Sequence, residues 1–226
     1  KNIELLKKMS EITSSRGPDN EGFFFNDNFS LGHNRLSIID VEKRSNQPLR
    51  FNDLIISFNG EIYNYLDLKK QLQDLGYFFD TNSDTEVIIK LFDKYKLESF
   101  KMLSGIFAFS IYDINKNIFY LVRDAVGVKP LYYYHNKFDK KFYFSSLIKS
   151  LLISNINKEL NLSAVRSYAN FNRNDFAETF FKKIFKVIPG ELIIFDNKNK
   201  ILNKEHFLKY NFNYNYDQKS IKKNIE

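Results

Sequence analysis

Apolar residues recur along this chain at two spacings, one typical of helices and the other of strands. Leu5, Met9 and Ile12 repeat at helical spacing before Gly17-Pro18 stops the pattern. Leu68, Leu72 and Leu75 do the same before Gly76. With weaker patterns included, we expect helices over residues 1–14, 64–75, 83–95, 146–153 and 163–170.

The clearest sequence signal for the N-terminus of a helix lies at Ser83. Ser83-Asp84-Thr85-Glu86 has the pattern of a capping box, in which a hydroxyl and a carboxylate three residues apart satisfy the first N–H groups of a helix. The apolar face that follows, from Val87 to Tyr95, makes this the best defined helix of the chain.

Short apolar and aromatic runs predict strands within residues 22–36 (broken at 26–28), 54–58, 106–112, 118–122, 132–134, 142–144 and 191–195, the last of them. Strands follow strands more often than they alternate with helices. This order favours an α+β fold with antiparallel sheets over a doubly wound parallel sheet. Ile221 and Ile225, one helical turn apart, hint at another helix from Lys219.

Composition narrows the function classes. The 226 residues contain no cysteine, which excludes a disulfide framework, a thiolate metal site and a thiol nucleophile within the printed sequence. The net charge is +7, but the lysines are scattered and form no basic tract, so a solvated surface explains them better than a nucleic-acid site. No apolar stretch is long enough to span a membrane, and we expect a cytoplasmic protein.

The sequence contains no motif typical of a metal site or a nucleotide site. The three histidines, His33, His135 and His206, are far apart in sequence and lack metal-ligand spacing. Gly17 and Gly22 have the spacing of a phosphate loop, but Phe follows where such a loop needs Lys. We therefore expect neither a metal nor a cofactor in this chain.

Polar residues at the ends of predicted elements are the remaining candidates: Arg35, Asn59, Gly60, Glu61, Asp84, Arg123 and Asp124. Each has a purely structural interpretation. Asn-Gly between apolar runs is the strongest short hairpin signal, and Asp84 suits a helix N-terminus electrostatically. The structural alternative for Arg35 is an ordinary surface cation.

Together these groups fit a site for a free amino acid with a side-chain amide. A planar cation such as Arg35 suits an α-carboxylate, and Glu61 with Asp84 suits an α-ammonium. The Asn59 carboxamide and the Gly60 N–H suit an oxyanion.

At these residues the sequence resembles the glutaminase domain of glutamine-hydrolysing asparagine synthetases, which are class II, N-terminal-nucleophile amidotransferases. The resemblance covers most of residues 1–195 and is carried by RGPDNEGF (16–23), GHNRLSIID (32–40), SNQPL (45–49), FNGEIYN (58–64), SDTEVI (83–88), LSGIFAFSIYD (103–113) and RDAVGVKPLYYY (123–134). RGPD, RLSIID and NGEIYN in one chain resemble the asparagine-synthetase type more than the amidotransferases that act on sugar phosphates or phosphoribosyl pyrophosphate.

The resemblance implies a four-layer αββα sandwich and assigns roles. Asn59 and Gly60 would form the oxyanion hole. Glutamine would be held by Arg35, Leu36, Ser37, Ile38, Ile39, Asn59, Gly60, Glu61 and Asp84. Glutamine hydrolysis to glutamate would supply ammonia for the ATP-dependent amidation of aspartate.

The chain also departs from the family pattern. The family's nucleophile is an N-terminal cysteine followed by Gly-Ile, so we expect a domain at residues 1–195 without its first strand, inactive by itself. Residues 196–226 would be a linker and the start of a synthetase domain, where ATP and Mg would bind. Leu147 stands where the family has an acidic residue.

Three hypotheses follow: the glutaminase half of an asparagine synthase, an amidotransferase acting on another carboxylate such as a surface-sugar acid, and a non-catalytic glutamine-binding module. The expected partners are glutamine and a synthetase domain of the same protein, with a homodimer left open and neither nucleic acid nor membrane.

Overall fold

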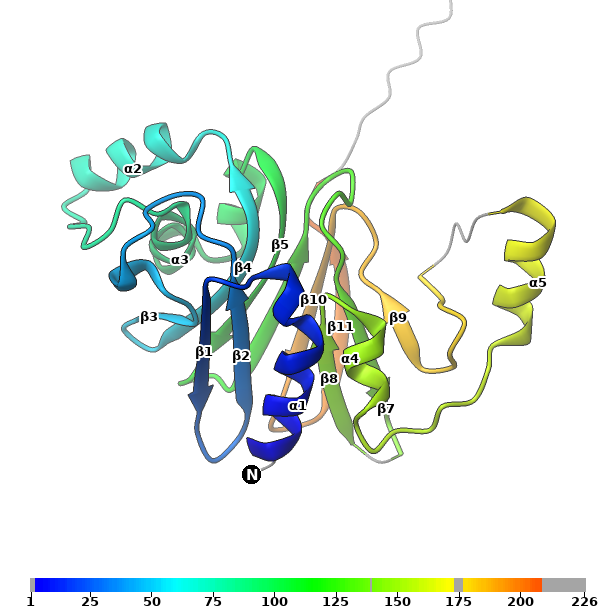
Figure 1. Cartoon of the computed structure of the whole chain (residues 1–226). Helices are drawn as coiled ribbons and strands as arrows, with labels where there is room; N and C mark the ends of the chain where they lie inside the picture. The colour runs from blue at the N-terminus through cyan, green and yellow to red at the C-terminus, as the bar shows by residue number, and fades with distance from the viewer. Residues whose placement is uncertain (1–2, 139, 173–176, 209–226) are drawn as a thin grey trace, which may run out of the picture.

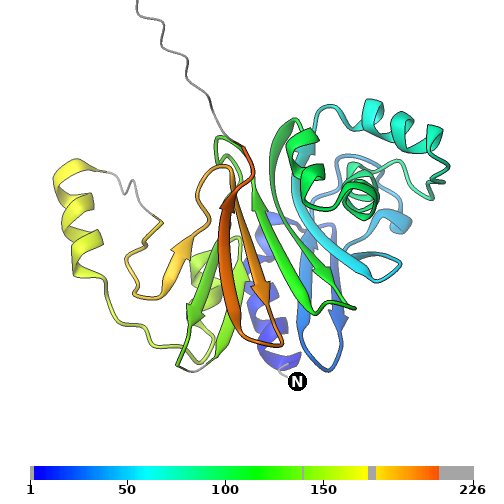
Figure 2. The same ribbon diagram turned by 180° about the vertical axis from the view of Figure 1, so that it is seen from behind.

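The computed structural model describes residues 3–138, 140–172 and 177–208, and the helix expected from Lys219 lies outside them. Its largest sheet has six antiparallel strands in the order β11-β10-β6-β5-β4-β3. These strands are β3 (Leu49–Phe51), β4 (Leu54–Ile62), β5 (Gly105–Asp113), β6 (Ile118–Arg123), β10 (Glu191–Asp196) and β11 (Ile201–His206). Figure 2 shows β10 and β11, in orange, beside the green β5 and β6.

Two smaller antiparallel sheets form a second layer. One pairs β1 (Asn20–Phe25) with β2 (Ser30–Arg35). The other has the order β8-β7-β9, built from β7 (Tyr132–Asn136), β8 (Lys141–Ser145) and β9 (Ile184–Lys186). Aromatic residues of β8 pack against the six-stranded sheet, as in the stack of Phe142 on Phe195 with ring centroids 4.0 Å apart.

Helices cover both outer faces. The helix α3 (Asp84–Tyr95) packs on the six-stranded sheet, and α2 (Tyr65–Asp74) packs against α3. The helices α1 (Ile3–Thr13) and α4 (Ile148–Leu152) cover the second layer (Figure 1). The helix α5 (Leu162–Phe171) stands apart from this stack. The result is the predicted α+β fold, with layers in the order αββα.

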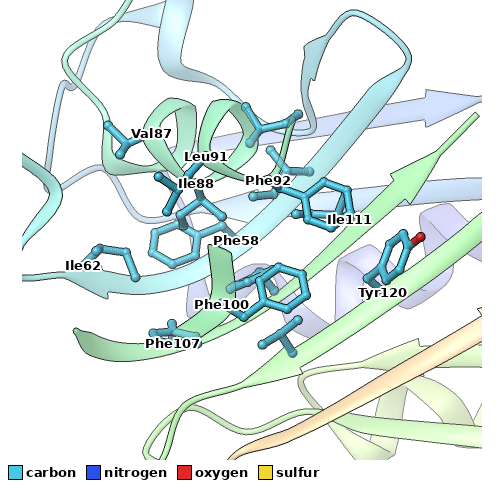
Figure 3. Packing of buried hydrophobic residues seen from close by; sticks show 14 of the residues in the cluster. Phe58, Ile62, Val87, Ile88, Leu91, Phe92, Phe100, Phe107, Ile111 and Tyr120 are labelled. Carbon is cyan, nitrogen blue, oxygen red and sulfur yellow. The ribbon is translucent and has the colours of Figure 1, made fainter. Parts of the chain in front are cut away.

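The largest apolar cluster lies between α3 and the six-stranded sheet (Figure 3). Val87, Ile88 and Leu91 are almost fully buried there against Phe58 and Phe109. Removing such side chains from water stabilises the fold by about 1.5–3 kcal/mol each. This packing fixes where α3 begins relative to β4, and both elements carry candidate residues.

Three local predictions needed correction. Asn59 and Gly60 lie inside β4, so the hairpin interpretation of Asn-Gly is wrong. Ser83 does cap α3, because its side chain accepts the Glu86 N–H at 3.3 Å, but the Glu86 carboxylate does not return that bond. It accepts the N–H groups of Asp80 and Thr81 at 3.0 and 2.7 Å.

The strand at Glu191 is not the last one, since β11 pairs with β10 along its whole length. The sequence of β11 gave no strand signal because the strand is exposed and mostly polar. The sheet therefore continues past residue 195, and Phe207 is buried in the main core. Where a following domain begins stays a prediction.

Within the described ranges, no helix is long and apolar enough to cross a membrane.

Candidate active site

The predicted site residues meet at one cavity of ≈ 760 Å³, which is lined by α1 and by strands of both layers. Arg35, Leu36, Ile38, Ile39, Asn59, Gly60, Glu61 and Asp84 all line it. Ser37 does not, and its backbone N–H donates instead to Asp19 Oδ2 at 2.7 Å. The fold thus brings together predicted site residues from three separate stretches of the sequence.

Asn59 and Gly60 lie where the outer edge of β4 is open. The odd-numbered residues of β4 bond to β5, as the contacts of Tyr63 N–H and Asp53 O at the two ends of the ladder show. Even-numbered residues therefore turn their N–H groups to the opposite edge. The partner on that edge, β3, ends opposite Ile56, so the N–H of Gly60 faces the cavity without a strand beside it.

Only glycine fits at position 60. Its φ of +154° is rare for residues with a side chain, and an added Cβ would lie 2.2 Å from the carbonyl oxygen of Ile106. The half-buried Asn59 carboxamide has no hydrogen-bond partner among the described residues. Two amide donors are thus available at adjacent positions.

Two carboxylates stand beside these donors. Asp84 is buried at the start of α3, where its Oδ2 accepts the N–H of Ile62 at 3.1 Å. Burial, together with the charge of Glu61, raises the pKa of Asp84 to about 6. Two neighbouring carboxylates suit an ammonium ion, because its positive charge would offset the repulsion between them.

Arg35 is more occupied than its predicted role requires. The guanidinium is buried, and its two Nη groups donate to the backbone oxygens of Ile39, Asp40 and Glu42 and to Asn46 Oδ1. These bonds order the loop that begins with Leu36 and Ile38, whose side chains are more than half exposed. Arg35 therefore shapes the rim of the cavity through its loop.

A polar group on the cavity wall was missed by the sequence argument. His33 Nδ1 lies 2.9 Å from Ser57 Oγ, and burial, reinforced by the Arg35 cation, lowers the pKa of His33 to about 4. The ring is neutral at physiological pH. Ser57 pairs across the sheet with Ser110, whose Oγ is buried and has no partner within the described part of the chain. No sequence motif marks these residues, because only strand pairing brings them together.

Arg123 and Asp124 turn out to be structural. Arg123 donates to the backbone oxygens of Gly127, Lys129 and Val187. Neither Arg123 nor Asp124 lines the cavity. Leu147 likewise lies outside the cavity lining, just before α4. Within the described ranges, no three His, Asp or Glu residues gather as metal ligands would.

Comparisons with known proteins agree with this geometry. A family model described as "Glutamine amidotransferase domain" matches residues 1–207. Asparagine synthetase [glutamine-hydrolyzing] 1 of Bacillus subtilis is 39% identical over 92% of this chain and 33% of its own length. A putative asparagine synthetase of Methanocaldococcus jannaschii is 34% identical over 96% of this chain and 46% of its own. Amidase chry2 of Gibberella zeae is 37% identical over 85% of this chain and 28% of its own length.

The chain thus spans between about a quarter and a half of the length of these relatives. Among solved structures, a glutamine phosphoribosylpyrophosphate amidotransferase from B. subtilis has a TM-score of 0.58 at 22% identity, over 80% of this chain and 35% of that one. A second, titled as the allosteric regulatory enzyme of purine biosynthesis, has a TM-score of 0.55 at 22% identity over the same shares. At this identity the two structures support the fold alone.

Proposed function

This chain belongs to the glutamine amidotransferase domain family, and from that premise we propose that it is the glutaminase part of a glutamine-hydrolysing asparagine synthase. The observation that carries the proposal is the cavity itself. It gathers two adjacent amide donors, two carboxylates and an arginine-ordered loop within one hollow. These groups suit the binding of free glutamine and the stabilisation of the oxyanion that forms when its amide is cleaved.

We assign the roles as follows. Glu61 and the ionised Asp84 hold the α-ammonium of glutamine. Arg35 and the backbone of the loop over residues 36–39 hold its α-carboxylate, with Arg35 acting largely by ordering that loop. The Asn59 carboxamide and the Gly60 N–H receive the oxygen of the side-chain amide.

The reaction follows from this placement. A thiolate attacks the side-chain carbonyl carbon of glutamine, and the negative charge that moves to the oxygen is stabilised by Asn59 and Gly60. The C–N bond then breaks, the nitrogen takes up a proton and leaves as ammonia, and a thioester remains. Water hydrolyses the thioester to glutamate and restores the thiol.

We propose that the thiol comes from an extended segment outside the printed sequence, seated between β2 and β8. In the part of the chain that the structure describes, β2 pairs only with β1 and β8 only with β7, so each strand has a free edge. Residues of both strands line the cavity, and the unpartnered Ser110 Oγ lies in its wall. A strand added there would bond to both edges and could bring its end to Asn59.

We also propose that the ammonia is used by a synthetase domain that binds aspartate, ATP and Mg. The names and lengths of the relatives support this, because the chain matches one third to one half of the two asparagine synthetases. We place the protein in the cytoplasm, where glutamine and ATP are available, and leave its oligomeric state to measurement.

The test uses the complete coding polypeptide. It should release glutamate from glutamine and, given aspartate and ATP with Mg, should form asparagine from either glutamine or free ammonia. The printed chain alone should bind glutamine in a calorimeter without releasing ammonia. A complete polypeptide that binds glutamine but never hydrolyses it would show a non-catalytic module instead.

The acceptor needs its own measurement, because an amidase stands among the relatives. If the complete protein hydrolyses glutamine but forms no asparagine, the glutaminase role stands and the amide acceptor is another carboxylate.

A further inference from the structure

We propose that Gln47 is a positioning residue that keeps the N–H of Gly60 open as an oxyanion donor. The proposal rests on the proposed function and adds a residue to it. It starts from the edge of β4, where three successive outward N–H groups belong to Phe58, Gly60 and Ile62.

The strand beside this edge stops early. The last pair of β3 with β4 is Leu49 with Ile56, and the next hydrogen-bonded pair in that register would be Gln47 with Phe58. The carbonyl of Gln47 turns away instead and lies against β1, where a Cβ on Gly22 would come within 2.0 Å of it. The backbone of Gln47 therefore cannot continue the ladder towards Gly60.

The side chain of Gln47 takes over the lost bond. Its Oε1 accepts the N–H of Phe58 at 2.6 Å, and its Nε2 donates to Thr85 Oγ1 at 3.3 Å. The residue is 7% exposed, and both bonds are buried. A buried amide that uses both ends of its side chain is held in one orientation.

On the far side of Gly60, Asp84 Oδ2 accepts the N–H of Ile62. The two outer donors of the edge are thus satisfied by side chains, and the middle donor is left for a ligand. If β3 continued through position 47, its backbone would pair with Phe58 and the strand would extend towards the Gly60 N–H. A side-chain partner closes one rung of the ladder and ends there.

Gln47 also sets the distance across the site. Phe58 and Thr85, which it joins, are sequence neighbours of Asn59 and Asp84 respectively. Its amide therefore connects the strand that carries the oxyanion donors to the helix that carries the ammonium-binding carboxylate. Losing it should misplace the donors by a fraction of an ångström, which matters most in the transition state.

The test compares Gln47→Met with Gln47→Glu and Thr85→Val in the complete polypeptide. Gln47→Met keeps the length of the side chain but leaves the Phe58 N–H unpaired. We expect kcat for glutamine hydrolysis to fall about 10–100-fold with less than about threefold change in KM, because the loss concerns the oxyanion donor. Gln47→Glu retains an acceptor for Phe58 and should stay closer to the wild type. Thr85→Val breaks the bond to α3 but leaves the Phe58 N–H paired, so it should lower kcat less than Gln47→Met does. Ammonia-dependent synthesis should survive all three.

Amide hydrogen exchange on the complete polypeptide gives a second readout that needs no catalysis. The Phe58 N–H should be protected in the wild type and should lose protection in Gln47→Met, with the rest of β4 and β5 unchanged. If protection is lost while kcat stays at the wild-type value, or if Gln47→Met lowers glutamine- and ammonia-dependent activity equally, the positioning role is overturned. If the wild-type polypeptide fails to hydrolyse glutamine, the proposed function fails and this proposal fails with it.

Discussion

At the end of β6, Asp124 accepts the backbone N–H groups of Phe107, Val126, Val128 and Lys129, whereas near the end of β4 the amide donors of Asn59 and Gly60 face a cavity. Both pairs, Arg123-Asp124 and Asn59-Gly60, place a polar side chain near the end of a strand. In the sequence they are equally good candidates for a binding site. The first uses all of its hydrogen-bonding capacity to hold a loop. The second leaves its donors available.

The contrast shows what distinguishes a structural polar corner from a binding one. A fully buried carboxylate must be satisfied by the protein, since leaving it unpaired is expensive. An oxyanion site must instead present donors that the protein itself does not use. Substitutions at the Asp124 corner should therefore lower stability, whereas substitutions at the Asn59-Gly60 corner should lower activity.

The largest effect should come from Asp124→Ala. It removes the acceptor for four N–H groups around a residue that is 0% exposed. An unsatisfied buried group costs about 1–3 kcal/mol, but only the bond to Phe107 is fully buried and the other three are part-buried, so we expect the free energy of unfolding to fall by about 2–4 kcal/mol. Denaturant-induced unfolding of the 226-residue chain measures this change in the free energy of unfolding. The matched control is Asp196→Ala, which removes a similar N–H acceptor from an exposed turn and should cost far less. Equal losses would show that burial is not the cause.

Asn59→Ala should behave in the opposite way. Its carboxamide supports no other described group, so stability should stay near that of the wild type. Turnover of glutamine by the complete polypeptide should fall about 10²–10³-fold, as expected for one lost oxyanion donor. Steady-state kinetics with glutamine and, as the control, with ammonia would measure this. A large loss of stability would place Asn59 with Asp124 instead.

Arg35→Ala lies between these cases, because Arg35 orders a loop and faces the cavity. We expect glutamine affinity to weaken by about 10–100-fold, with a smaller change in kcat, since a ground-state contact is removed. Arg35→Lys keeps the charge but cannot reproduce the forked bonds to Ile39, Asp40 and Glu42, so it should rescue little. Full recovery by lysine would mean that charge alone matters.

The smallest effect concerns pH. Because the pKa of Asp84 is about 6 in the free protein, the carboxylate is ionised above that pH and neutral below it. An ammonium ligand prefers the ionised form, so glutamine affinity should be constant above about pH 7 and fall up to tenfold per unit below 6. Calorimetric titrations from pH 5 to 8 would show it. Asp84→Asn should bind weakly at every pH, and an unchanged pH profile in that variant would exclude Asp84 as the titrating group.

Much of the fold could be predicted from the sequence. The helices at α1, α2 and α3 and the hairpin of β5 and β6 follow from apolar periodicity and from Gly76. The short or polar strands β3, β9 and β11 were missed because they have too few apolar positions to produce a pattern. Asn59-Gly60 was interpreted as a turn because local propensity favours one, and pairing with β5 overrides that preference.

By itself, the sequence determined which chemical groups are present: an arginine, two acids, an Asn-Gly pair and no cysteine. Only the tertiary structure decided which of them are free to act. It saturated Arg123 and Asp124, engaged Arg35 with its own loop, and left the Gly60 N–H open between Gln47 and Asp84. The physical reason is that hydrogen-bond satisfaction depends on neighbours across the sheet and from α3, and those neighbours are distant in the sequence.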